Sequence, residues 1–282
     1  MMKNILIPGL ILFAFATVQA QPEDKKISKI TFMMVDGKYE DAAYKTEKLR
    51  EDSEYRRNGW VYFYMSQSYY EIAKKPELQE DYPRAMKEAL KAAYKLSKYR
   101  DKTDENMEVF KDAQEYLTEL KDSAITISEI FYDNDNPRKA AYYLGKIVKF
   151  DEDDYAVWLM KGVYEIKSRN IGEGVKSILM AMDSINNNPD YKPDGVSAQT
   201  MVDALEEYAL LIKSGEYDKY FSAYKFEPTE ADVQKALAMS EEYKKYIVGE
   251  KVDKVERKKE SETIYKSFKS EDIEEDSDSD DD

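Results

Sequence analysis

The sequence predicts an all-α fold. Charged residues make up 36% of the chain and hydrophobic residues 42%, while its 282 residues include only 10 Gly and 8 Pro, a balance that favours long helices over a strand-rich sandwich. The stretch YAVWLMKGVYEIKSRNIGEGVKSILMAMDSINNNP, residues 155–189, supports this prediction. Its apolar residues fall at helical spacing in two runs, separated by a break that contains Gly. The stretch therefore predicts a helix, a short turn and a second helix.

The first 20 residues have the pattern of a secretory signal peptide. An apolar run from Ile5 to Val18 follows Lys3, and the small residues Val18 and Ala20 flank a cleavage site expected before Gln21. The run is short for a membrane span, so a retained membrane anchor is the weaker alternative. The chain contains no Cys, which excludes lipid attachment near the cleavage site and suits a bacterial periplasm or outer surface. We expect a periplasmic or secreted protein whose helical domain covers residues 21–248.

Further helical hairpins are predicted from small residues that recur after turn sequences. The first is marked by GKYEDAAYKTEKL at 37–49, and the second combines 59–72 with 81–96. The third combines 124–131 with 136–147, the fourth is 155–189, and the fifth begins at GEYDKYFSAYKF, 215–226. The residues at the start of each second helix are Ala42, Ala85, Ala140, Gly174 and Tyr220, which are 43, 55, 34 and 46 residues apart. The period is irregular, with extra residues in the turns and in a long first helix at 104–132.

The fourth hairpin resembles the tetratricopeptide repeat, whose 34-residue unit has W-x2-L-G-x2-Y in its first helix and A-x3-F in its second. The matching positions are Trp158, Gly162, Ile178 and Ala181, with Gly174 in place of Ala. Lys161 and Glu165 depart from the signature at its Leu and Tyr positions. The resemblance implies a degenerate tetratricopeptide-like helical-hairpin repeat array, an α-solenoid, over residues 25–228.

The C-terminal part is predicted to hold one more helix and an acidic tail. A helix from Thr229 to about Val248, with Glu230 and Asp232 in its first turn, is expected to cap the array. Residues 249–282 are highly charged and are expected to be mostly disordered, with a transient helix around Val252 to Glu262 as the alternative. The segment SEDIEEDSDSDDD at 270–282 contains nine acidic residues. We interpret this tail as a solvated segment. Loose binding of divalent cations and docking on a basic partner are the alternatives.

Composition excludes several kinds of chemistry. The absence of His and Cys removes Ser-His and Cys-His nucleophile systems and the usual zinc sites, and no phosphate-binding Gly-rich loop occurs. A hydrolase that uses only carboxylates is the remaining enzymatic alternative. With 58 acidic and 43 basic residues, the net charge is −15, which disfavours nucleic acid as a partner. We therefore expect a protein that is not an enzyme and has no cofactor or catalytic metal.

The resemblance also implies a binding groove, because the first helices of tetratricopeptide arrays line a concave face. The mapped positions form an apolar and aromatic lining, which would take an apolar or amphipathic peptide segment. A groove that is closed on itself is the alternative. The predicted lining residues are Trp60, Phe63, Gln67, Tyr70, Ile125, Glu129, Tyr132, Leu159, Val163 and Ile166.

These observations favour an exported, non-enzymatic scaffold that binds another protein or peptide segment, itself an envelope component, without stable membrane insertion once the signal peptide is cleaved. The alternative function is a glycan- or substrate-binding component of an outer-membrane uptake or secretion machine. We rank this alternative lower, because such uptake proteins typically carry a lipid-anchored Cys and many Trp residues, whereas this chain has no Cys and two Trp.

Overall fold

A computed structural model describes residues 24–247 and 259–266 of the chain. These residues form helices joined by loops and contain no β-strand, so the predicted all-α fold is confirmed. Within the described ranges, no helix combines the length and the apolar character that crossing a bilayer requires. The predicted signal peptide and the acidic segment 270–282 lie outside the described residues.

The helices are short to medium in length, and 3-10 turns occur in the described parts of four connections. The α-helices are α1 (Lys25–Val35), α2 (Tyr39–Glu51), α3 (Gly59–Ala73), α4 (Ala85–Tyr99), α5 (Asp104–Asp112), α6 (Gln114–Asp133), α7 (Pro137–Phe150), α8 (Tyr155–Lys167), α9 (Ile171–Asn187), α10 (Ser197–Ser214), α11 (Asp218–Phe221), α12 (Glu230–Tyr243) and a helix at 259–266. The 3-10 turns are Pro76–Leu78, Arg100–Lys102, Ser222–Tyr224 and Lys244–Tyr246.

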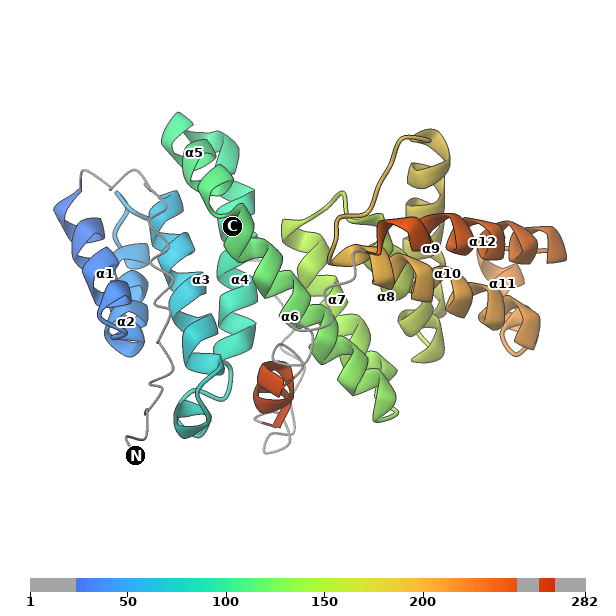
Figure 1. Ribbon diagram of the computed structural model, residues 1–282, viewed down its shortest axis with the longest axis horizontal. Coiled ribbons are helices and arrows are strands. Elements are labelled where there is room, and N and C mark those ends of the chain that lie inside the picture. The colour runs from blue at the N-terminus through green and yellow to red at the C-terminus, as the bar shows by residue number, and fades with distance from the viewer. Residues whose placement is uncertain (1–23, 248–258, 267–282) are drawn as a thin grey trace, which may run out of the picture.

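Consecutive helices pack side by side along the long axis of the molecule (Figure 1). Helices adjacent in sequence form the largest contacts, as in α3 with α4, α6 with α7 and α8 with α9. Contacts between α4 and α7 and between α8 and α10 join these pairs, and one continuous cluster of buried apolar side chains runs from Ile27 to Ile264. Apolar burial along the whole row therefore holds the helices together.

Three of the hairpins share the same turn. Gly37, Asp135 and Arg169 each follow the first helix of a pair and have left-handed backbone angles, with φ of 69°, 58° and 70°. In each turn the next residue donates its N–H to the carbonyl five residues earlier, as Lys38 does to Met33 at 2.9 Å, and the left-handed residue donates to the carbonyl three residues earlier. This is the Schellman C-cap, in which both bonds satisfy helix-end carbonyls.

The predicted small residues lie at one fixed place after this turn. Ala42, Ala140 and Gly174 each come five residues after the left-handed residue, and each donates its N–H to the carbonyl four residues before it. All three are buried. A small side chain at this place lets the second helix approach the first closely, most of all at Gly174, where an added Cβ would lie 2.7 Å from the Gly162 carbonyl oxygen.

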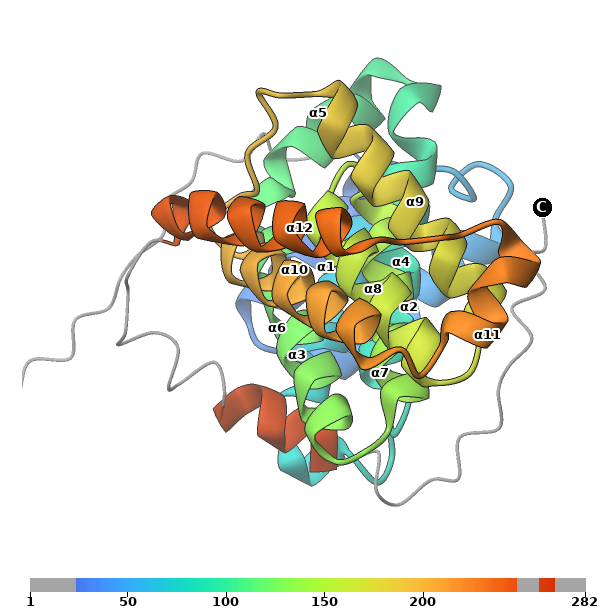
Figure 2. The same ribbon diagram turned by 90° about the vertical axis from the view of Figure 1, so that its right-hand side faces the viewer.

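Two predicted elements differ in the structure. The long helix expected over 104–132 is divided into α5 and α6 at Ala113, which is fully buried. The second helix expected for the fifth hairpin is only α11, four residues long. Instead, α12 packs along α10, as Figure 2 shows. A capping box at Thr229 and Asp232 fixes the start of α12, near the predicted helix start.

Beyond 249, residues 259–266 form a docked helix, which overlaps the end of the transient helix expected at 252–262 and replaces the disorder expected for the rest of this stretch. This helix lies between the α3–α4 connection and α6 (Figure 1). Ile264 is 1% exposed, the Tyr265 ring meets the Phe131 ring edge to face at 4.8 Å, and Gln79 donates its side-chain N–H to the Thr263 carbonyl at 2.8 Å. The segment is polar by composition, and its two adjacent apolar residues, Ile264 and Tyr265, dock it.

Removing residues 259–282 should lower the midpoint of thermal unfolding by roughly 3 to 6 °C, because the fully buried Ile264 contributes about 2 kcal/mol. Removing only 267–282 should shift it by less than about 1 °C. Both chains should be measured by circular dichroism in 0.5 M salt, where contacts between exposed charges are screened. Equal midpoints for the two truncated chains would show that the helix at 259–266 adds no stability.

Candidate partner-binding groove

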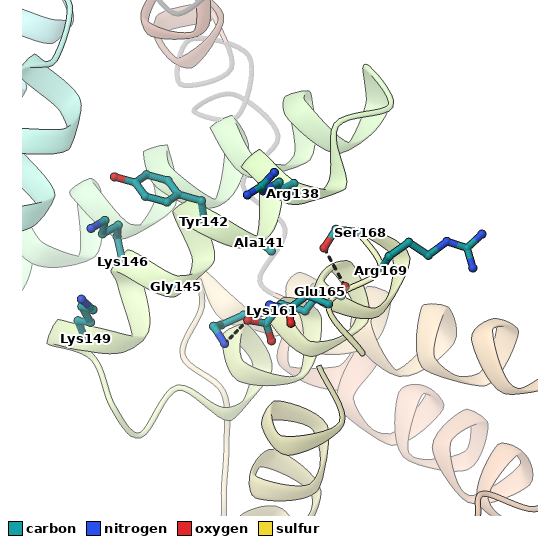
Figure 3. Close-up of a pocket in the computed structure, with 11 residues that line it drawn as sticks. Arg138, Ala141, Tyr142, Gly145, Lys146, Lys149, Lys161, Glu165, Ser168 and Arg169 are labelled. Carbon is teal, nitrogen blue, oxygen red and sulfur yellow. Dashed lines mark hydrogen bonds and ion pairs between the residues drawn. The ribbon is translucent and has the colours of Figure 1, made fainter. Parts of the chain in front are cut away.

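Four residues of α7 form a stripe along one side of a groove between α7 and α8. Arg138, Tyr142, Lys146 and Lys149 are separated by four, four and three residues, which places them on one helix face. The groove encloses about 640 Å³. Its other wall is formed by residues of α8 and of the turn that follows, namely Lys161, Glu165, Ser168, Arg169 and Asn170 (Figure 3).

Small residues set the depth of this groove. Ala141 and Gly145 line it from α7, one turn apart. An added Cβ at Gly145 would lie 3.5 Å from the Lys161 side chain, an ordinary contact distance, so the long side chains of α8 lie over the Gly145 backbone. Larger residues at these two positions would fill part of the space that is available to a ligand.

The two departures from the tetratricopeptide signature form an ion pair in this groove. Lys161 Nζ lies 2.7 Å from Glu165 Oε1 and donates to Ser177 Oγ at 2.9 Å. Ser177 in turn donates to Glu165 Oε2 at 2.8 Å, which closes a ring of three side chains across α8 and α9. Among the described residues that line the groove, Glu165 is the only acidic one, whereas Arg138, Lys146, Lys149, Lys161 and Arg169 are basic. Lys161 pairs with Glu165, and Arg169 pairs with Glu216 outside the groove at 2.9 Å.

The basic character extends from the groove onto α4. Lys146 Nζ lies 4.8 Å from the centre of the Tyr142 ring, and Lys87 of α4 lies over the same ring at 5.6 Å. Lys149 lies 5.5 Å from the ring of Tyr94, also on α4. We define the basic face as these cations and the others at helical spacing on α4, namely Arg84, Lys87, Lys91, Lys95, Lys98, Arg138, Lys146 and Lys149.

This concentration of positive charge contrasts with the chain as a whole, whose net charge is −15. Two lysines of the basic face, Lys87 and Lys146, are only 8% exposed. The gathered positive charge suits an acidic ligand, and the Tyr142 ring at its centre, between Lys87 and Lys146, keeps 36% exposure.

The predicted lining residues occupy a different place. Seven of them are buried in the core rather than along an open groove, namely Trp60, Phe63, Tyr70, Ile125, Leu159, Val163 and Ile166. The division into α5 and α6 explains part of this burial, because Tyr116 of α6 covers α3. Its ring meets Phe63 at 5.9 Å and Tyr70 at 6.0 Å. These seven residues contribute packing within the chain and offer no free surface to a partner.

Three predicted residues keep exposed surface, but they lie in separate surroundings. Glu129 is exposed and Gln67 is partly buried. Tyr132 stacks on Tyr164 at 4.3 Å, and its hydroxyl accepts a hydrogen bond from Lys167. None of the three lines the groove between α7 and α8. Their role in binding stays a prediction.

A group of three carboxylates has the composition of a cation site. One oxygen each from Asp151, Asp154 and Asp194 lies within 4.8 Å of the others. The ammonium of Lys121, from α6, occupies the place between them at 2.7, 2.9 and 2.5 Å. The carboxylates therefore have their counter-ion in the chain itself, and the arrangement is a structural ion cluster.

Burial and neighbouring charges together shift the pKa values of the groups in this cluster. Burial lowers the pKa of Lys121, but the charges of Asp154, Asp151 and Asp194 outweigh it, so the pKa lies above its usual value. Burial raises the pKa of Asp151, and although the charge of Lys121 lowers it, the pKa remains above its usual value. The pKa of Asp194 is lowered, because the charge of Lys121 outweighs burial there.

Sequence reasoning did not find the basic face, although part of its signal is in the sequence. Arg84, Lys87, Lys91, Lys95 and Lys98 recur every three or four residues, and Arg138, Lys146 and Lys149 share a helix face at spacings of eight and three residues. A stripe of basic residues is usual on the solvated face of a helix, so neither stripe alone indicates a binding site. Only the packing of α4 on α7 brings the two stripes together.

Comparisons with protein-family models, with curated proteins and with solved structures found no significant match to the chain.

Proposed function

We propose that this chain is an exported, non-enzymatic scaffold built as a tetratricopeptide-like helical-repeat array, and that it binds an acidic segment of a partner protein on its basic face. The basic face carries the proposal, because eight cations gather there in a chain of net charge −15. The partner differs from the apolar peptide expected from the sequence, because the apolar lining is buried.

The repeated turn supports the array. Schellman caps at Gly37, Asp135 and Arg169, each followed at five residues by a buried small residue, are what a duplicated helical hairpin would conserve. In such an array the basic face belongs to second helices, α4 and α7. In this proposal α12, which packs on α10, caps the last hairpin.

Export is the part of the proposal that rests on sequence alone. It is supported by the apolar run from Ile5 to Val18 and by the small residues before Gln21. The partner would then be an acidic segment of an envelope protein. A glycan- or substrate-binding component of an outer-membrane machine stays the alternative, with the exposed Tyr142 ring as the surface for a sugar to stack on.

Binding of a fluorescein-labelled peptide of alternating Glu and Asp, twelve residues long, tests the acidic partner. The protein should be the full chain with the nine acidic residues of 270–282 changed to Gln and Asn, so that the tail cannot interfere. Arg138→Glu with Lys149→Glu should weaken binding by at least about tenfold, because two attractive charges become repulsive. Fluorescence anisotropy at 50 mM salt measures this.

The matched control is Lys176→Glu with Lys213→Glu, which changes the net charge equally at exposed sites outside the groove. It should change the affinity by less than about twofold. If both pairs weaken binding alike, or if the peptide does not bind at all, the basic face is not a site for acidic segments and the proposed function is wrong.

A further inference from the structure

The helix at 259–266 is the last described element before the acidic segment, and it lies close to the groove between α7 and α8. It is docked by the buried Ile264 and by the Tyr265 ring against Phe131. The Phe131 ring stacks on Tyr143 at 5.5 Å, and Tyr143 meets Tyr142 of the groove at 5.4 Å. Three ring contacts thus connect the docked helix to the centre of the groove.

The remaining chain is long enough to cover that face. Residues 267–282 number 16, and an extended chain spans about 3.3 Å per residue, so they reach much further than these three contacts. The α7 stripe from Arg138 to Lys149 covers twelve residues of helix, and its ends are about 16 Å apart. The tail can therefore run along the whole stripe without moving the docked helix.

The charges of the two segments are complementary. Nine of the thirteen residues at 270–282 are acidic, and Ile273 is the only apolar one. The basic face presents eight cations, two of them on lysines that are 8% exposed. Because the docked helix at 259–266 tethers the tail to the same chain, the tail would meet the face at an effective concentration in the millimolar range.

We infer that the acidic segment 270–282 binds the basic face of its own chain and competes there with an acidic partner. The inference rests on the proposed function for the nature of the site, and it adds the occupant. A partner must displace the tail. Its apparent affinity is therefore its intrinsic affinity multiplied by the fraction of chains in which the tail is not bound. Salt weakens the tail contact and the partner contact alike.

A peptide of residues 270–282, added to the protein in trans, tests this inference. It should bind the tail-neutral chain, in which the nine acids are Gln or Asn, at least about tenfold more tightly than the unchanged chain, because only the unchanged chain carries a competitor. Arg138→Glu with Lys149→Glu in the tail-neutral chain should abolish the gain, and Lys176→Glu with Lys213→Glu should preserve it.

The contact can also be observed directly, because the chain has no Cys and a single label can be placed at will. A nitroxide on Ser279→Cys should broaden the backbone amide resonances of Gly145 and Lys146 at 50 mM salt and leave them sharp in 1 M salt. The same label should have no effect on these amides when Arg138 and Lys149 are both Glu.

The results separate the two claims. If the Glu-Asp peptide binds the tail-neutral chain and the unchanged chain equally well, the proposed function stands and the tail inference is overturned. If neither chain binds it, the proposed function fails as well. Self-association of the unchanged chain that is lost in the tail-neutral chain, detected by sedimentation, would place the tail on a second copy and also overturn the inference.

Discussion

Gly162→Ala should lower the free energy of unfolding by about 3 kcal/mol, because it forces two helix backbones apart. An added Cβ at Gly162 would lie 2.7 Å from the Ile178 side chain and 2.8 Å from the carbonyl oxygen of Gly174. The carbonyl belongs to α9 and cannot rotate away. Relief requires α8 and α9 to separate along their whole contact, the largest between any two helices of the described residues.

Gly145→Ala is the matched control for this change. Gly145 also lies inside a helix, α7, but its added Cβ would meet only the Lys161 side chain, at an ordinary 3.5 Å. The replacement should stabilise the protein by up to about 1 kcal/mol, because Ala has the higher helix propensity. Urea unfolding of both variants measures the difference. Equal stability of the two would show that α8 and α9 are not in close backbone contact.

Lys121→Met should lower the free energy of unfolding at pH 7 by about 3 kcal/mol, because it leaves three carboxylates without their counter-ion. Asp154 is 4% exposed, whereas Asp151 and Asp194 keep 38% and 48% exposure, which keeps the expected cost at the low end for a buried ion pair. The cluster also joins α6 to the starts of α8 and α10, since Asp154 and Asp194 accept hydrogen bonds from the backbone N–H groups of Val157 and Ser197.

The same variant should respond to pH in a defined direction. In the native chain the pKa of Asp194 is lowered, so its stabilising contribution is present above its unfolded pKa and is lost as the pH falls. Without Lys121, burial and mutual repulsion raise the carboxylate pKa values, and groups with raised pKa values lose their contribution as the pH rises. The deficit of Lys121→Met should therefore shrink between pH 7 and pH 4.5.

Lys176→Met provides the control, because the Lys176 side chain is 78% exposed and its ion pair with Glu173 is on the surface. It should change stability by less than about 0.5 kcal/mol at either pH. Thermal unfolding at pH 7 and pH 4.5 measures all three chains. A deficit of Lys121→Met that does not depend on pH would mean that lost packing, and not the carboxylates, explains it.

The sequence was sufficient to predict the local structure. Helical spacing around Trp158, a small residue at Ala42, Ala140 or Gly174 and a capping sequence at Thr229 are properties of short segments, and each predicted a helix or a turn that the structure contains. The docking of the helix at 259–266 was not predicted, because it depends on contacts with Gln79 and Phe131 more than 130 residues away.

Only the tertiary structure decided which helix faces are buried and which charges meet. Trp60, Phe63 and Tyr70 are apolar enough for either a groove or a core, and the position of Tyr116 on α6 decided for the core. The stripes on α4 and α7 are separated by about 40 residues of sequence, and Lys121 is at least 30 residues from each of its carboxylates. Spacing along a chain specifies which residues share a helix face, whereas apolar burial summed over all the helices determines which faces come together.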